Sequence, residues 1–226
     1  MSTGTSVRRT SEATVAFVDL AGFAALTEVH GDDRAVELVE EFEGFAAAAL
    51  GPRDRLVKML GDAAMFAFAD PGAALAALRR VIGTCLNAPG FPLPRAGIHH
   101  GPVVERAGDL FGRTVNLAAR VADQARGGEV VVTREVAKAA SDAGLEVTYV
   151  GLYRLRNLSG SVALFEVTLC ALPAASSVDP VCRMRVDQRD APNRLRHGDA
   201  VYWFCSPSCA DTFTSDPDGF VAALAV

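Results

Sequence analysis

The sequence has little that would place the chain in a membrane or on nucleic acid. Its 226 residues contain no apolar run near the roughly 18 residues that a membrane helix needs. Residues 1–15 lack the apolar core of a secretory signal. Basic residues are not in excess: 22 Lys and Arg stand against 27 Asp and Glu, for a net charge of -5. A general nucleic-acid binder needs a basic face. We therefore expect a soluble, cytoplasmic protein with no membrane span and no nucleic-acid partner.

The composition excludes a disordered chain, because 50% of the residues are apolar. The length suits one domain with a small second one, or two small domains. Residues 172–177 (LPAASS) predict a linker between a first domain at 10–171 and a second at 178–226. The second segment is too short for its hydrophobic core alone to stabilise it, so a bound metal or another cross-link is expected.

The first domain is expected to alternate strands with helices. Asp32 and Asp33 are expected to cap a helix that reaches about residue 50, Pro71 to open a second, and further helices to occupy residues 114–124 and follow residue 133. Apolar runs bounded by turn residues predict strands at residues 13–20, 56–60, 63–69, 95–99, 129–133, 146–153 and 162–168. Hairpins interleave with crossovers, which predicts an α+β fold with a mixed, mostly antiparallel sheet.

Two aspartates stand where apolar strands end. Asp19 closes the first strand, and Asp62 follows Gly61 at the tip of a hairpin. Carboxylates that end neighbouring strands can converge on a hard divalent cation, which prefers oxygen ligands. Taken alone, an aspartate at such a position is more often a turn former, and Asp62 beside Gly61 fits that interpretation especially well. The residues by themselves leave both interpretations open.

A second polar pair lies on the helix expected at residues 114–124. Asn116 and Arg120 are spaced i, i+4 and share one helix face. An amide beside a planar cation suits a phosphate or a developing oxyanion. The alternative is a solvated polar stripe on an amphipathic helix.

Four strings in fixed order resemble the class III adenylate cyclases: AFVDLAGFAALTE, VKMLGDAAMFAF, AGIHHGPVV and GDLFGRTVNLAARV. Together they span roughly residues 13–168. The resemblance implies a ferredoxin-like βαββαβ palm that works as a head-to-tail homodimer. It also implies cyclisation of a nucleoside triphosphate with release of pyrophosphate.

The resemblance assigns roles to residues at matching positions. Asp19 and Asp62 resemble the family's metal-binding aspartates, which hold two Mg²⁺ or Mn²⁺ ions. Asn116 resembles the ribose-positioning residue and Arg120 the residue that stabilises the transition state. The family's triphosphate cradle corresponds to the backbone of Leu20, Ala21, Gly22 and Phe23.

Three further residues of the implied site read the base or contact a phosphate. Lys58 and Asp109 resemble the purine-reading pair. Arg156 stands where the family often has a phosphate-contacting lysine before a glycine, which Asn157 replaces here. In the family one chain brings the aspartates, and its partner brings Lys58, Asp109, Asn116 and Arg120. Because this chain carries both halves, a homodimer with two equivalent sites is expected.

The sense of the hydrogen bonds selects the base. Lys58 can only donate and ionised Asp109 can only accept, which complements N1 and the 6-amino group of adenine. Guanine reverses both and would leave polar groups mismatched. We therefore expect ATP as substrate and 3',5'-cyclic AMP as product. A guanylate cyclase, or a catalytically silent cyclase fold that serves as a metal-responsive interaction module, is the alternative.

Three of the five cysteines, Cys182, Cys205 and Cys209, crowd the last quarter of the chain in the spacing C-x22-C-x3-C. With the aromatic run before Cys205, this segment resembles the YHS/TRASH family of small domains associated with metal binding, although Arg183 replaces a usual glycine. Three thiolates favour Zn²⁺ or Cu⁺. The alternative is that they pack as core hydrophobes. The domain is expected to sense metal or redox state and to modulate the enzyme.

The fourth ligand of such a site is left open, with Asp179 and His197 as candidates. The remaining histidines, His30, His99 and His100, are expected to be turn or near-core residues, because local hydrogen bonds readily satisfy neutral histidine. Cys85 and Cys170, which stand alone in apolar surroundings, are expected to be small buried hydrophobes.

Overall fold

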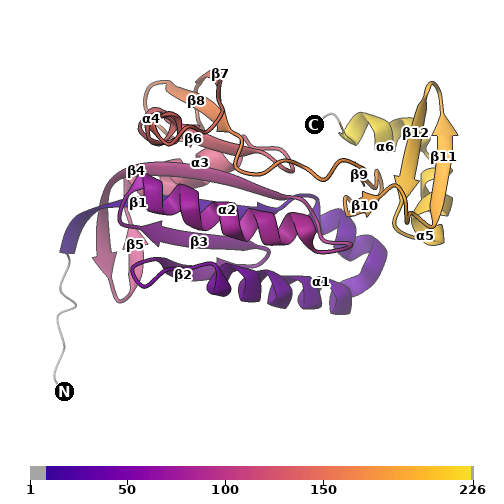
Figure 1. Ribbon diagram of the computed structural model, residues 1–226, viewed down its shortest axis with the longest axis horizontal. Coiled ribbons are helices and arrows are strands. Elements are labelled where there is room, and N and C mark those ends of the chain that lie inside the picture. The colour runs from indigo at the N-terminus through magenta and orange to yellow at the C-terminus, as the bar shows by residue number, and fades with distance from the viewer. Residues whose placement is uncertain (1–8, 225–226) are drawn as a thin grey trace.

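An eight-stranded sheet forms the centre of the computed structural model, which describes residues 9–224 (Figure 1). Its strands are β1 (Arg9–Leu20), β2 (Arg55–Leu60), β3 (Ala63–Phe68), β4 (Pro94–Arg106), β5 (Asp109–Phe111), β6 (Val130–Thr133), β7 (Val147–Tyr153) and β8 (Val162–Val167). The order is β2-β3-β1-β4-β6-β8-β7, with β5 paired to β4. Only β4 and β6 run parallel, so the expected mixed, mostly antiparallel α+β fold is confirmed.

Helices cover both faces of this sheet because the strands alternate apolar residues toward each side. Val18 of β1 belongs to the core shared with three helices, whereas Val15 belongs to a cluster that includes Ala118 on the other face. The helices are α1 (Phe23–Ala48), α2 (Pro71–Asn87) and α4 (Arg134–Asp142) on the first face, and α3 (Arg113–Ala122) on the second. Among the described helices, none is both long and apolar enough to cross a membrane.

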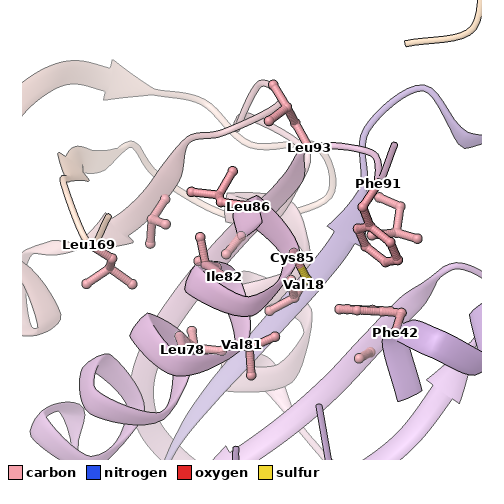
Figure 2. Close-up of a cluster of buried hydrophobic side chains, with 14 of the residues drawn as sticks. Val18, Phe42, Leu78, Val81, Ile82, Cys85, Leu86, Phe91, Leu93 and Leu169 are labelled. Carbon is pink, nitrogen blue, oxygen red and sulfur yellow. The ribbon is translucent and has the colours of Figure 1, made fainter. Parts of the chain in front are cut away.

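The largest part of the core lies between α1, α2 and the sheet. Figure 2 shows Val18 of β1 facing Phe42 of α1 and the apolar side of α2. Cys85 of α2 is fully buried there, and burial raises the pKa of its thiol to about 12. This confirms the expectation that Cys85 is a small core hydrophobe. Cys170 is only half-buried, against the edge of the same cluster.

The start of α1 differs from the expectation. The helix begins at Phe23, directly after Gly22, whose left-handed φ of 74° starts the first turn. Gly31 has φ 83° and ψ 168° and interrupts the helix just before Asp32. The acidic pair therefore follows a break between two helical segments. The helix predicted from Asp32 corresponds to the second segment, and the first segment, which buries Leu26, was not predicted.

Strand β4 is also longer than expected. It continues through Gly101 and Pro102 because β1 pairs with it along its whole length, including Glu12 opposite Pro102. β6 pairs only with residues 96–98 and β5 only with residues 104–106, so Pro102 has a partner strand on one side alone. A proline, which lacks an N–H donor, is tolerated at such a position.

The C-terminal part of the described chain, from Ser176 to Leu224 and here called the tail, packs against one end of the large sheet (Figure 1). A backbone bridge joins Pro92 to Met184, and Arg185 donates from Nη2 to the carbonyl of Ala88 at 2.6 Å. Strand β9 includes residues 176–177, so the last part of the expected linker is a strand. The tail comprises β9 (Ser176–Val178), β10 (Arg185–Asp187), β11 (Asn193–His197), β12 (Ala200–Phe204), α5 (Pro207–Phe213) and α6 (Pro217–Leu224).

Gly97 of β4 permits the close approach of α3 to the sheet. A Cβ at Gly97 would lie 2.0 Å from the backbone nitrogen of Ala122, at the end of α3. We expect Gly97→Ala to lower the free energy of unfolding by about 1–3 kcal/mol, because overpacking displaces the backbone. Urea denaturation measures this. The control is Gly44→Ala within α1, where a Cβ meets nothing within 4 Å. Equal stability of the two variants would contradict the role of Gly97.

Candidate active site

Asp19 and Asp62 meet at one end of the sheet. β1 and β3 pair in the register Asp19 opposite Ala63, which places the residue before Ala63 beside Asp19. Gly61, with a left-handed φ of 67°, makes the turn that presents Asp62. The pKa of Asp62 is raised to about 6, first by burial and then by the hydrogen bond and negative charge of Asp19. The structure thus brings together the two aspartates expected to bind metal.

Arg95 faces the same pair from β4. It stands opposite Asp19 in the strand register, and its Nε donates to Asp19 Oδ2 at 2.9 Å. The guanidinium of Arg95 thus faces the carboxyl groups of Asp19 and Asp62, and the carboxyl group of Asp62 has a raised pKa. Two adjoining carboxylates that repel each other are a donor set that fits hard divalent cations such as Mg²⁺ and Mn²⁺.

The loop from Leu20 to Phe23 connects this end of β1 to α1. Ala21 donates its backbone N–H to the carbonyl of Leu93 at 2.9 Å, and Gly22 begins the helix. The loop borders a cavity of about 470 Å³ that Arg95 and Arg183 also line. A Cβ on Gly22 would lie 2.2 Å from Cγ of Arg183. The tail therefore packs directly against the expected triphosphate cradle.

Lys58 and Asp109 form an ion pair although they lie 51 residues apart. Lys58 comes from β2 and Asp109 opens β5, and the distance from Nζ to Oδ2 is 2.6 Å. The hydrogen bond from Lys58 is the main cause that lowers the pKa of Asp109. Both side chains are about one third exposed, at 37% and 30%, so a ligand can reach them. A donor and an acceptor thus stand side by side at an accessible position.

Asn116 and Arg120 lie on α3, as expected from their spacing. Asn116 is exposed, and Arg120 forms an ion pair with Asp123 at 2.8 Å, one turn later. Within residues 9–224 no hydrogen bond or ion pair joins either of them to Asp19 or Asp62. Within a single chain the acidic pair and the α3 pair are therefore not in direct polar contact.

Arg156 lies exposed in the turn between β7 and β8. Asn157, which replaces the family's usual glycine, has a left-handed φ of 61°. Asparagine is one of the few residues that tolerate this conformation. The replacement therefore keeps the backbone conformation that a glycine would give this turn.

The three tail cysteines converge, as expected of a metal site. Sγ of Cys205 lies 3.4 Å from Sγ of Cys182 and 3.6 Å from Sγ of Cys209. The pKa of Cys209 is lowered because the thiols of Cys182 and Cys205 donate to it, and the pKa of Cys182 is raised because its thiol donates to the other two. The three thiols are therefore one hydrogen-bonded cluster in which each affects the pKa of the others.

Neither candidate for the fourth ligand belongs to this cluster. Asp179 is fully buried and accepts backbone N–H groups from Val181 at 2.9 Å and from Cys205 at 2.8 Å. His197 contacts Asp218 at 2.8 Å. The side chain that joins the three sulfurs is His30 of α1, which was expected to be a turn or near-core residue. This contact was not predicted, because no spacing motif links His30 to cysteines more than 150 residues away.

Two other histidines behave as expected. Nδ1 of His99 lies 2.8 Å from Oγ1 of Thr133, and Nδ1 of His100 lies 2.8 Å from Oγ1 of Thr14. Burial is the main cause that lowers the pKa of His99 to about 4. Both are near-core residues with local partners.

Comparison with known proteins places the first domain. Residues 91–168 match the family described as the adenylate and guanylate cyclase catalytic domain. A pH-sensitive adenylate cyclase of Mycobacterium tuberculosis is 38% identical over 160 residues, covering 69% of this chain and 40% of that protein. An adenylate cyclase of Streptomyces griseus is 42% identical over 125 residues, covering 55% of this chain and 31% of that protein.

The fold is also that of a solved cyclase. The crystal structure of the adenylyl cyclase CyaB from P. aeruginosa aligns with a TM-score of 0.62 at 20% identity, covering 71% of this chain and 95% of that one. The chain spans less than half the length of the two curated relatives described above, at 40% and 31%. The similarity therefore concerns the catalytic domain. In sequence and in fold, the first domain of this chain is therefore similar to the catalytic domain of adenylate and guanylate cyclases.

Proposed function

We propose that this chain is an adenylate cyclase that converts ATP to 3',5'-cyclic AMP and pyrophosphate. The observation that carries the proposal is the contact between Lys58 and Asp109 at 2.6 Å. It fixes a cation that only donates beside a carboxylate that only accepts, which complements N1 and the 6-amino group of adenine. Similarity to the cyclase catalytic domain and the adjoining carboxyl groups of Asp19 and Asp62 support the reaction class.

The reaction is attack of the ribose 3'-oxygen on the α-phosphorus, with pyrophosphate leaving on the opposite side. Asp19 and Asp62 would hold two Mg²⁺ or Mn²⁺ ions, which lower the pKa of the 3'-hydroxyl and neutralise the phosphates. The backbone N–H groups from Leu20 to Phe23 hold the triphosphate at the start of α1, where helix N–H groups favour anions. Arg156 adds a cation for a phosphate oxygen.

The polar pair on α3 acts on the reacting sugar and phosphate. Asn116 orients the ribose so that its 3'-oxygen lies in line with the bond to be broken. Arg120 donates from its guanidinium to oxygens on the α-phosphorus as negative charge builds there. Arginines in comparable positions of phosphoryl transfer enzymes contribute on the order of 10³–10⁵ in rate.

The active enzyme is a head-to-tail homodimer with two shared sites. Asp19 and Asp62 of one protomer face Lys58, Asp109, Asn116 and Arg120 of its partner. The acidic pair and the α3 pair are not in direct polar contact within one chain, which supports the arrangement. Two-fold symmetry then makes two identical sites from two identical chains.

Incubation of the purified protein with ATP or GTP, in the presence of Mg²⁺ or Mn²⁺, tests the proposal when the products are separated by chromatography. We expect cyclic AMP and pyrophosphate from ATP, and little product from GTP. The control is Asp62→Ala, which is expected to lose the product because it removes a metal ligand. Formation of cyclic GMP in preference to cyclic AMP would identify a guanylate cyclase. Failure to form either under every combination would identify a catalytically silent cyclase fold.

A further inference from the structure

Four potential metal ligands from two distant parts of the chain surround one point. Cys182 lies between β9 and β10, Cys205 follows β12, Cys209 belongs to α5, and His30 belongs to α1 of the cyclase domain. One ligand atom from each of them lies within 4.8 Å of all the others. Nε2 of His30 is 3.5 Å from Sγ of Cys205 and 3.9 Å from Sγ of Cys209.

These separations match a tetrahedral site. With Zn–S bonds of about 2.3 Å and Zn–N bonds of about 2.0 Å, two sulfurs lie about 3.8 Å apart and a sulfur and a nitrogen about 3.5 Å apart. The sulfurs here are 3.4 and 3.6 Å apart along the two closest pairs, far beyond the roughly 2.05 Å of a disulfide. All the cysteines are free thiols. The four side chains are thus spaced as ligands of one ion.

The surroundings of the cluster hold its ligands in place. The buried carboxyl group of Asp179 accepts the backbone N–H of Cys205 and ties together the two loops that carry Cys182 and Cys205. Ser206 accepts the backbone N–H of Cys209 at 3.1 Å and begins α5. Hydrogen bonds of this kind orient the ligands of a metal and are part of its affinity.

We propose that His30, Cys182, Cys205 and Cys209 bind a single Zn²⁺ ion that clamps the tail onto helix α1 of the cyclase domain. Three thiolates and one imidazole are among the ligand sets of structural zinc sites. The imidazole and the fourfold arrangement favour Zn²⁺ over Cu⁺, which softer ligands bind. Because one ligand comes from the catalytic domain, the ion connects two parts of the protein that otherwise meet through few backbone contacts.

The clamp acts on the segment that begins the nucleotide site. The helical segment from Phe23 to His30 lies between two glycines with left-handed φ, Gly22 at 74° and Gly31 at 83°. Zinc fixes the last residue of this segment, while Arg183 of the tail packs on Gly22 at its start. Both ends of the segment are therefore held by the tail. The influence of this contact on catalysis rests on the proposed function, whereas metal binding and docking do not.

Metal content and hydrogen exchange of the full chain test the clamp without any nucleotide. We expect the wild-type protein to hold one Zn²⁺ per chain by elemental mass spectrometry. His30→Ala should weaken zinc binding by at least 10–100-fold, the loss typical of removing even a group that orients a ligand. His197→Ala, which changes a histidine outside the cluster, should bind zinc like the wild type. Adding zinc should slow amide exchange at residues 23–30 of the wild type but not of His30→Ala.

A second variant keeps the test decisive if His30→Ala fails to fold. His30→Cys supplies another zinc ligand at the same position and should retain one Zn²⁺ per chain. With Co²⁺ in place of Zn²⁺, its visible absorption should shift relative to the wild type, because a sulfur replaces the nitrogen. Unchanged zinc affinity of His30→Ala, an unchanged Co²⁺ spectrum of His30→Cys, or disulfides among the three cysteines would overturn the proposal. Each of these results is independent of whether the protein makes cyclic AMP.

Discussion

An equimolar mixture of Asp19→Ala and Arg120→Ala proteins is expected to regain about one quarter of the wild-type cyclase activity, although each is inactive alone. The two residues act on the same nucleotide from different protomers. If chains exchange freely, half of the dimers are mixed. One site of each mixed dimer carries both substitutions, and the other carries neither. The measurement is cyclic AMP formation by the two proteins before and after mixing.

The control for this experiment is a mixture of Asp19→Ala with Asp62→Ala. Both of these residues belong to the same half of the site, so every site of a mixed dimer lacks one aspartate. This mixture is expected to stay inactive under the same exchange conditions. Absence of recovery in the first mixture, with exchange demonstrated by differently tagged chains, would refute the shared site. Recovery in both mixtures would refute it as well.

The second large effect concerns the choice of base. In Lys58→Glu/Asp109→Asn the first side chain accepts and the second donates, which reverses the hydrogen-bond sense of the pair. We expect kcat/KM for ATP to fall about 100-fold or more, because each mismatched buried hydrogen bond costs about 1–3 kcal/mol. Activity with GTP should rise relative to ATP, since guanine presents a donor at N1 and an acceptor at O6. Steady-state kinetics with both nucleotides measure the change.

A neighbouring ion pair supplies the matched control. Arg55 of β2 and Glu105 of β4 contact each other at 2.7 Å, on the same side of the molecule as Lys58 and Asp109. Neutralising this pair in Arg55→Gln/Glu105→Gln should leave the preference for ATP unchanged. If that variant loses ATP selectivity while Lys58→Glu/Asp109→Asn retains it, the assignment of the base-reading pair is wrong.

Much of the fold follows from local patterns in the chain. Apolar runs bounded by turn residues predicted β1 and β3, and the turn at Gly61 joins β2 to β3 as expected. Asp70 caps α2 by accepting the N–H of Ala73 at 2.9 Å, and Pro71 opens the helix. Such features are readable because a periodic pattern or a cap acts between residues a few positions apart.

Local patterns missed parts of two elements. A helical segment begins at the acidic pair after Gly31 as predicted, yet the residues before Gly31 are helical too, and Leu26 among them is buried in the core. Gly101 and Pro102 look like a strand end, yet β4 continues because β1 supplies hydrogen-bond partners beyond them. In both cases a tertiary contact outweighs a local preference.

By itself, the sequence determined the order of the main strands and helices of the first domain, the cyclase resemblance, the residue types of the nucleotide site and the presence of three cysteines close together in the last quarter of the chain. Only the tertiary structure decided that His30 completes the cysteine cluster and that Arg183 lies on Gly22. Helices and hairpins form through contacts between residues a few positions apart, so a sequence pattern can predict them. The ligands from α1, α5 and the tail loops meet only after the apolar faces of distant segments have packed. The identity of a residue therefore shows what it can bind, and long-range packing decides which others bind with it.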